Sequence, residues 1–154
     1  MRNQSQRGFT LAELIFVIGI MSVVIVGMMK LYIYASMLAE LAGNKTYAVS
    51  EAHNKLEEIR NHTYDQIATD YASGGTPGNT FNVSNLTGKG FIYVDSSNAN
   101  LLQVKVAVCW RDKYSRIVGE CSESGGSLVA GTDADGDGAV SSPATLITNI
   151  AKKS

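Results

Sequence analysis

Hydrophobic residues are concentrated at the start of the chain. From Phe9 to Met29 the sequence carries one charged side chain, that of Glu13. A helix over these 21 residues is about 30 Å long, which matches the hydrocarbon core of a bilayer. The pattern predicts a helix over residues 9–30 that lies in a membrane or in the core of an assembly, with Lys30 at the far interface.

The helical pattern continues beyond this segment. Apolar residues recur mostly at intervals of three or four, the spacing of one helix face. They are Leu31, Tyr34, Leu38, Leu41, Ala42, Ala48, Val49, Ala52, Leu56 and Ile59. We expect one helix from about Phe9 to about Asn61, whose amphipathic second half, residues 31–62, packs against a globular head. Gly43 and Asn44 are where this helix bends most easily.

Residues 63–154 predict a head built on a small sheet. Residues 72–79 are glycine-rich and form a loop. Leu101–Trp110 alternates as a strand does, and the other strand candidates are Phe81–Val83, Phe91–Val94, Arg116–Gly119 and Ala144–Ala151. Together these predict an α+β fold, in which a long N-terminal helix carries a three- or four-stranded antiparallel sheet. Ser122–Ser142 is rich in glycine and serine and forms an insertion before the last strand.

The N-terminal segment can be interpreted in more than one way. A secretory signal peptide has a shorter apolar core and an A-x-A-like cleavage site, and the residues after the apolar run offer none. A plain signal anchor leaves Glu13 unexplained. A carboxylate in a membrane helix is costly unless it is paired or lies near the interface.

The leader and the start of the apolar run carry a recognisable motif. Residues 7–13, Arg-Gly-Phe-Thr-Leu-Ala-Glu, resemble the class III signal of type IV prepilins. In that family a membrane peptidase cuts between the glycine and the aromatic residue and methylates the new amine. The resemblance implies that residues 1–8 are a leader, that Gly8 and Phe9 flank the cleavage site, and that Glu13 is the acidic fifth residue of the mature chain. The Phe9 amine and a Glu13 carboxylate from a neighbouring subunit would neutralise each other, which favours assembly in register.

A weaker resemblance covers the second half of the predicted helix. Residues 47–60 and 64–67 are similar to the corresponding part of minor pilins and minor pseudopilins. The resemblance implies a pilin fold and a structural subunit of a type IV pilus-like filament, either a minor pilin or a type II secretion pseudopilin. Its implied partners are other pilin or pseudopilin subunits, a prepilin peptidase, and the inner membrane with its assembly platform. The precursor is expected in the bacterial inner membrane with its C-terminus outside, and then in a periplasmic or cell-surface filament.

Two cysteines, Cys109 and Cys121, lie in the head. In an exported protein such a pair is expected to form a disulfide, which here closes a hairpin. Two free thiols are the alternative. The spacing excludes a redox Cys-x-x-Cys motif.

An acidic loop, residues 131–142, contains alternating carboxylates. Asp133, Asp135 and Asp137 precede a glycine, as in the first half of a calcium loop of the EF-hand type. The carbonyl of Ala139 is a further candidate ligand. Three carboxylates this close repel one another without a cation, so the pattern favours structural calcium.

The rest of the calcium pattern is incomplete. Its twelfth position is Ala144, so the bidentate glutamate is missing, and a solvated acidic turn is the alternative. The resemblance adds support, since some pseudopilins hold calcium in a C-terminal loop. A calcium-dependent adhesin or ligand-binding module on a membrane anchor is the function of another class that this loop allows.

Catalysis is not indicated. The sequence has no nucleophile elbow, no HExxH and no phosphate-binding loop, so neither an enzyme nor a catalytic cofactor is expected. His53 and His62 fall on different faces of the predicted helix, which favours surface histidines over a metal site. The net charge is −1, and nothing in its distribution indicates a nucleic-acid partner.

Overall fold

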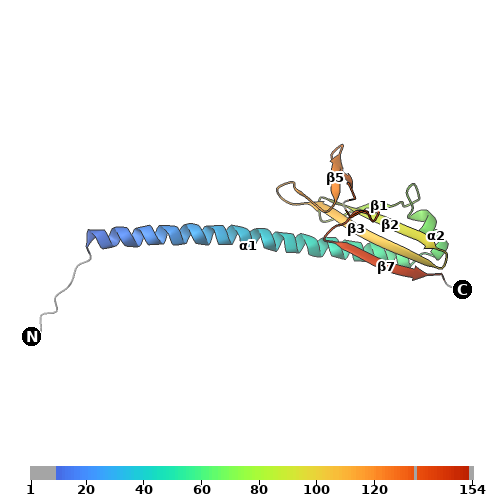
Figure 1. Cartoon of the computed structure of the whole chain (residues 1–154), viewed down its shortest axis with the longest axis horizontal. Coiled ribbons are helices and arrows are strands. Elements are labelled where there is room, and N and C mark those ends of the chain that lie inside the picture. The colour runs from blue at the N-terminus through green and yellow to red at the C-terminus, as the bar shows by residue number, and fades with distance from the viewer. Residues whose placement is uncertain (1–9, 134, 153–154) are drawn as a thin grey trace, which may run out of the picture. The chain divides into compact units, whose positions relative to one another are not determined.

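The computed structural model describes residues 10–133 and 135–152, which form two units. The first unit is Met1–Glu40 and the second is Leu41–Ser154. The helix α1, Leu11–Arg60, contributes to both (Figure 1). It contains no proline, and it continues without interruption through Gly43 and Asn44. The expected long helix is therefore present, beginning at Leu11 and ending at Arg60.

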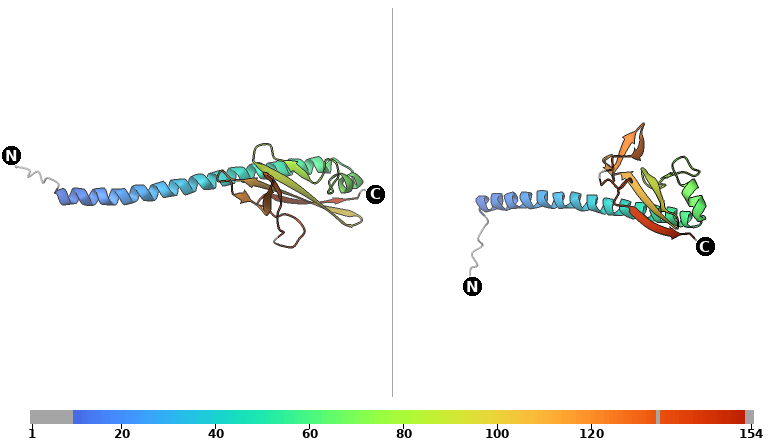
Figure 2. Two further views of the ribbon diagram at one scale, coloured as in Figure 1. Left: turned by 90° about the horizontal axis from the view of Figure 1, so that it is seen from above. Right: turned by 45° about the vertical axis from the view of Figure 1, so that its right-hand side comes forward.

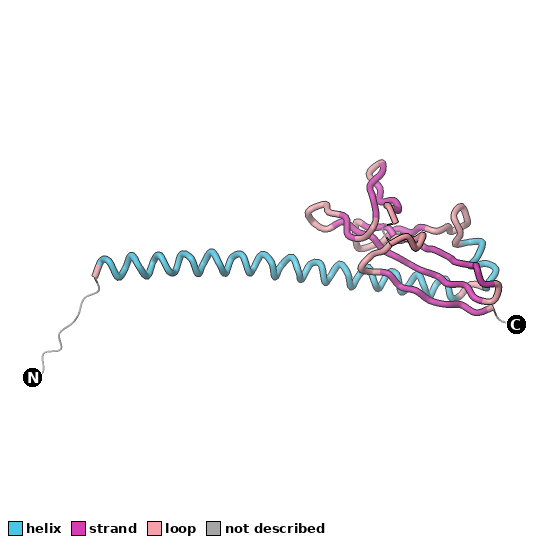
Figure 3. Tube along the Cα trace, viewed as in Figure 1, coloured by secondary structure: helices cyan, strands magenta, loops and turns pink. Residues whose placement is uncertain are grey.

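The second unit contains an antiparallel sheet of five strands (Figure 3). The strands are β1 Thr80–Asn82, β2 Gly88–Asn98, β3 Leu101–Arg111, β4 Ile117–Val118 and β7 Thr145–Ala151. The central strand β3 pairs with β2 on one side, and on the other with β7 along its first part and β4 at its end. The α+β fold is as expected, although the sheet has five strands rather than three or four.

The core of the second unit lies between this sheet and the last part of α1. The helix contributes Ala48, Ala52, Leu56 and Ile59, and the sheet contributes alternate residues of β3 from Leu102 to Trp110. Small alanine side chains let the helix approach the sheet closely. Burial of this apolar face provides the main stabilisation of the head, at about 25 cal/mol for each Å² removed from water.

A smaller apolar cluster covers part of the opposite face of the sheet. It contains Phe91 and Cys109 from the sheet, with Leu128 and Val140 from the chain that follows β4. Part of the expected glycine- and serine-rich insertion, Ser122–Ser142, therefore packs on the sheet. Its first half forms the hairpin of β5, Cys121–Ser124, and β6, Ser127–Ala130. Figure 2 shows this hairpin standing off from the five-stranded sheet.

A short helix, α2 (Tyr64–Asp70), follows α1. Thr63 precedes it and forms a capping box with Gln66, whose side-chain oxygen accepts a hydrogen bond from the Thr63 N–H at 3.0 Å. Ile67 and Tyr71 from this segment are buried in the main core. The segment thus closes the end of the head beyond Arg60.

Candidate functional site

The start of α1 carries the acidic residue of the predicted assembly site. Gly8 and Phe9, the predicted processing residues, lie outside the described residues. Glu13 is in the first turn of α1, where the helix dipole favours a negative charge. Its N–H donates to the Thr10 hydroxyl at 3.4 Å, and the Leu14 N–H donates to the Thr10 carbonyl at 3.2 Å. Thr10 therefore caps the helix, while the Glu13 side chain remains exposed.

The apolar surface of the first unit is uncovered among its described residues. Large apolar side chains between Leu11 and Tyr34 are 49% to 77% exposed. One helix of the described chain, α1, is long and apolar enough to cross a membrane. A continuous apolar surface of this kind requires lipid or other protein around it.

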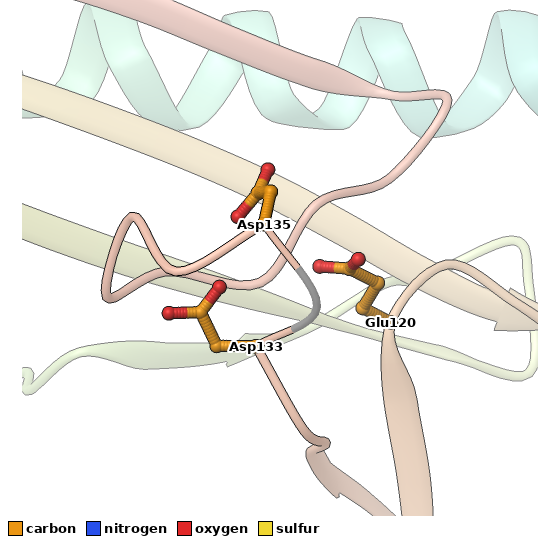
Figure 4. A group of neighbouring side chains, drawn as sticks. All are labelled: Glu120, Asp133 and Asp135. Carbon is orange, nitrogen blue, oxygen red and sulfur yellow. The ribbon is translucent and has the colours of Figure 1, made fainter.

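The acidic loop brings together three carboxylates, one of which the sequence pattern did not indicate. Each of Glu120, Asp133 and Asp135 offers a ligand atom, and these atoms lie within 4.8 Å of one another. Figure 4 shows Asp133 and Asp135 near each other, with Glu120 reaching the same region from the segment before β5. The Gly131 N–H donates to the Glu120 carbonyl at 3.0 Å, which continues the hairpin pairing and explains this proximity.

The loop is ordered by hydrogen bonds to its first aspartate. The two carboxylate oxygens of Asp133 accept from the N–H groups of Gly136 at 2.7 Å and Gly138 at 2.6 Å. The Gly138 bond is the main reason that the pKa of Asp133 is lowered. Both glycines have positive φ, 76° and 79°, so the turn depends on residues without a side chain. Asp133 is thereby kept ionised.

Glu120 and Asp135 are joined through Ser141. The Ser141 N–H donates to Glu120 at 2.9 Å, and its hydroxyl donates to Asp135 at 3.0 Å. Ser141, near the end of the acidic loop, therefore connects Asp135 within the loop to Glu120 before β5.

Asp137, the third predicted calcium ligand, is engaged elsewhere. Its carboxylate forms an ion pair with Lys105 of β3 at 2.5 Å, and this hydrogen bond is the main reason that its pKa is lowered. Ala139 follows with its N–H donating to Asp137 at 2.9 Å. The structure therefore groups Asp133 and Asp135 with Glu120 rather than with Asp137.

Cys109 and Cys121 are bonded, with an S–S distance of 2.03 Å. The bond joins β3 to β5, so it attaches the β5–β6 hairpin to the five-stranded sheet. The predicted pairing is supported, and the description of a stapled hairpin is refined: the two cysteines belong to different sheets.

The two histidines do not form a common site. The ring of His62 packs edge-on against Tyr71, with centroids 5.4 Å apart, and its Nδ1 lies 3.0 Å from the Glu58 carbonyl. His53 is exposed on α1.

Comparison with known families identifies the N-terminal region. Residues 3–29 match the model of the prokaryotic N-terminal methylation motif. No curated protein and no solved structure matches the chain. The matched segment includes Gly8, Phe9, Glu13 and the whole apolar run from Phe9 to Met29. Proteins with this motif are structural rather than enzymatic. The chain therefore carries the N-terminal methylation motif, which supports a type IV pilin-like protein with a class III signal peptide, and its long N-terminal helix and antiparallel sheet form a pilin-like arrangement.

Proposed function

We propose that the chain is a minor pilin, a structural subunit of a type IV pilus-like filament. The observation that carries the proposal is the methylation motif at residues 3–29, followed by an apolar helix surface that no described residue of the first unit covers. In the second unit, by contrast, Ala48, Ala52, Leu56 and Ile59 of α1 are buried under the sheet. The first unit is therefore the part that needs a membrane before assembly and neighbouring subunits afterwards.

Charge pairing provides the proposed assembly step. Cleavage after Gly8 creates a cationic amine on Phe9, and Glu13 of a neighbouring subunit supplies the anion. Either charge alone is costly in an apolar surrounding, whereas the pair is tolerated. Subunits in the correct register are thus favoured over displaced ones.

The experiment separates the Glu13 charge from its position in the helix cap. Glu13→Gln removes the charge and keeps a residue suited to the third position of a capping box. Thr10→Val removes the capping hydroxyl and keeps the charge. We expect Glu13→Gln to be processed normally but to enter filaments poorly, and Thr10→Val to assemble much better. The measurement is the amount of each variant in purified filaments relative to the membrane fraction.

Either of two results would count against the charge pair. Glu13→Gln could assemble as well as the wild type, or Thr10→Val could be as defective as Glu13→Gln. The second result would assign Glu13 to helix capping alone. Glu51→Gln, a neutralising change elsewhere on α1, is the matched control and should assemble normally.

A type II secretion pseudopilin is the alternative within the same structural class. A minor pilin should be recovered in fibres sheared from the cell surface. A pseudopilin should remain in the cell envelope, and its deletion should stop secretion of substrate proteins. The cellular fraction that contains the mature chain therefore distinguishes the two.

We also propose that the acidic loop binds structural calcium, held by Glu120, Asp133 and Asp135. Their convergence favours this, because carboxylate oxygens are the ligands that calcium prefers and the three charges repel one another without a cation. Asp137 and the carbonyl of Ala139 are additional predicted donors from the same loop. Bound calcium would supply positive charge that holds the loop against the sheet. A calcium-dependent adhesive role at the filament surface would use the same loop.

Thermal unfolding of the detergent-solubilised chain tests the calcium proposal. At 100 times its dissociation constant, a ligand stabilises the folded state by about 2.7 kcal/mol. Calcium should raise the midpoint of the wild type and leave Asp135→Asn unchanged. Asp65→Asn, on the surface of α2, should behave as the wild type. A wild-type midpoint that does not respond to calcium would refute the site.

A further inference from the structure

We propose that the head binds a small oxyanion, a carboxylate or phosphate group, in the pocket between the sheet and the β5–β6 hairpin. The pocket has a volume of about 220 Å³. Its lining includes two cationic side chains, two hydroxyl groups and two leucines: Lys89, Arg111, Thr87, Ser127, Leu86 and Leu128. It is separate from the acidic loop, none of whose residues line it.

The strand register places the two cations side by side. Lys89 of β2 lies opposite Cys109 of β3, and Arg111 is two residues further along β3. Residues two apart on a strand point to the same face, so Lys89 and Arg111 are diagonal neighbours across the strand pair. At the roughly 7–8 Å typical of diagonal pairs, two positive charges repel each other unless an anion lies between them.

The described residues neutralise the positive charges of Lys89 and Arg111 only in part. Arg111 Nη2 lies 2.9 Å from Glu123 Oε1 of β5, yet this buried nitrogen has no hydrogen-bond acceptor in suitable geometry. Among the described residues, Lys89 has no hydrogen bond or ion pair through its side chain. The pocket lining therefore contains two cations, and the one anion that neutralises them, Glu123, lies beside the pocket and is paired with Arg111 without a well-formed hydrogen bond to Nη2.

An oxyanion matches these unused groups. A guanidinium binds carboxylate and phosphate groups through parallel N–H bonds, and a lysine adds a charged donor. The Thr87 and Ser127 hydroxyls can donate to further oxygens. Glu123 would compete with the ligand for Arg111, which makes its removal informative.

The test is a calorimetric titration of the full chain in nonionic detergent at low salt, with inorganic phosphate and, separately, acetate as probes. We expect saturable binding of at least one probe at one site per chain. Lys89→Gln should weaken binding roughly tenfold or more, as expected for loss of a charge-assisted hydrogen bond. Lys152→Gln, an equal change of charge on an exposed lysine outside the pocket, should leave the affinity within about twofold.

A gain of affinity gives the sharpest check, because misfolding does not produce one. Glu123→Gln frees Arg111 from its carboxylate neighbour and should tighten binding up to about fivefold. The proposal is overturned if neither probe binds saturably, if Lys89→Gln binds as the wild type does, or if Glu123→Gln fails to tighten binding. Stronger binding of acetate would point to a carboxylate ligand, and stronger binding of phosphate to a phosphoryl ligand.

Discussion

Tyr71 shows how a single side chain can link the end of α1 to the chain beyond it. It is fully buried, and its hydroxyl donates to Glu58 at 3.3 Å. Burial, followed by the negative charge of Glu58, raises the pKa of Tyr71 from 10.0 to about 12. The folded head therefore holds this proton more tightly than the unfolded chain does.

The sign of the resulting pH dependence follows from that shift. The stabilisation by neutral Tyr71 is complete below pH 10 and is lost as the pH rises from 10.0 to about 12. The Tyr71→Phe variant has no hydroxyl proton to lose at this position. Its free energy of unfolding should therefore fall less over this pH range than that of the wild type. Denaturant unfolding at several pH values measures the difference. Parallel decreases for the wild type and the variant would contradict the assignment.

The backbone of Gly90 in β2 lies close to the ring of Phe81 in β1. A Cβ at this position would lie 2.0 Å from Cζ of the Phe81 ring, so the ring must move if a side chain is added. We expect Gly90→Ala to destabilise the head by about 1–3 kcal/mol. Gly43→Ala is the control, because no atom lies within 4 Å of its Cβ position and alanine favours a helix. Equal stability of the two variants would disprove the packing argument.

At the scale of elements, the helices and strands with a clear periodicity of apolar residues were predictable from the sequence, and the short polar strands were not. The alternation of side chains along Leu101 to Trp110, with Leu102, Val104, Val106 and Val108 on one side, identified β3. The end of β2, from Asp95 to Asn98, is polar and exposed, so its continuation depends on pairing with β3 and not on its own residues. The hairpin was missed for a similar reason, although the turn glycines Gly125 and Gly126 were a usable signal.

The candidate calcium site was likewise predictable from the sequence only in part. The alternating aspartates were visible in the sequence, but Glu120 is 13 positions before Asp133 and reaches it only through the hairpin. Likewise, the ion pair of Asp137 with Lys105 depends on how the loop packs on the sheet. Sequence spacing alone could not have separated these partners.

The disulfide should govern how firmly the hairpin is held to the sheet. Cys109 and Cys121 are separated by 12 positions, and a bond closing such a loop contributes roughly 3 kcal/mol. Reduction should lower the free energy of unfolding of the wild type by about that amount and leave Cys121→Ser unchanged. Denaturant unfolding with and without a reducing agent tests this. A wild type insensitive to reduction would show that the bond is not stabilising.

At the scale of the whole molecule, the two units differ in what surrounds their apolar residues. The second unit buries its apolar helix face under its own sheet. The first unit exposes an apolar surface and carries the methylation motif. A membrane precursor that later joins a filament accounts for both observations.

Processing at the N-terminus tests the central claim most directly. The measurement is the intact mass and N-terminal sequence of the chain expressed together with a prepilin peptidase, with a Gly8→Leu variant as the control. We predict a wild-type chain that begins at N-methylated Phe9 and a variant that keeps its leader. A wild-type chain that keeps residues 1–8, or one that is cut beyond Lys30, would contradict the account.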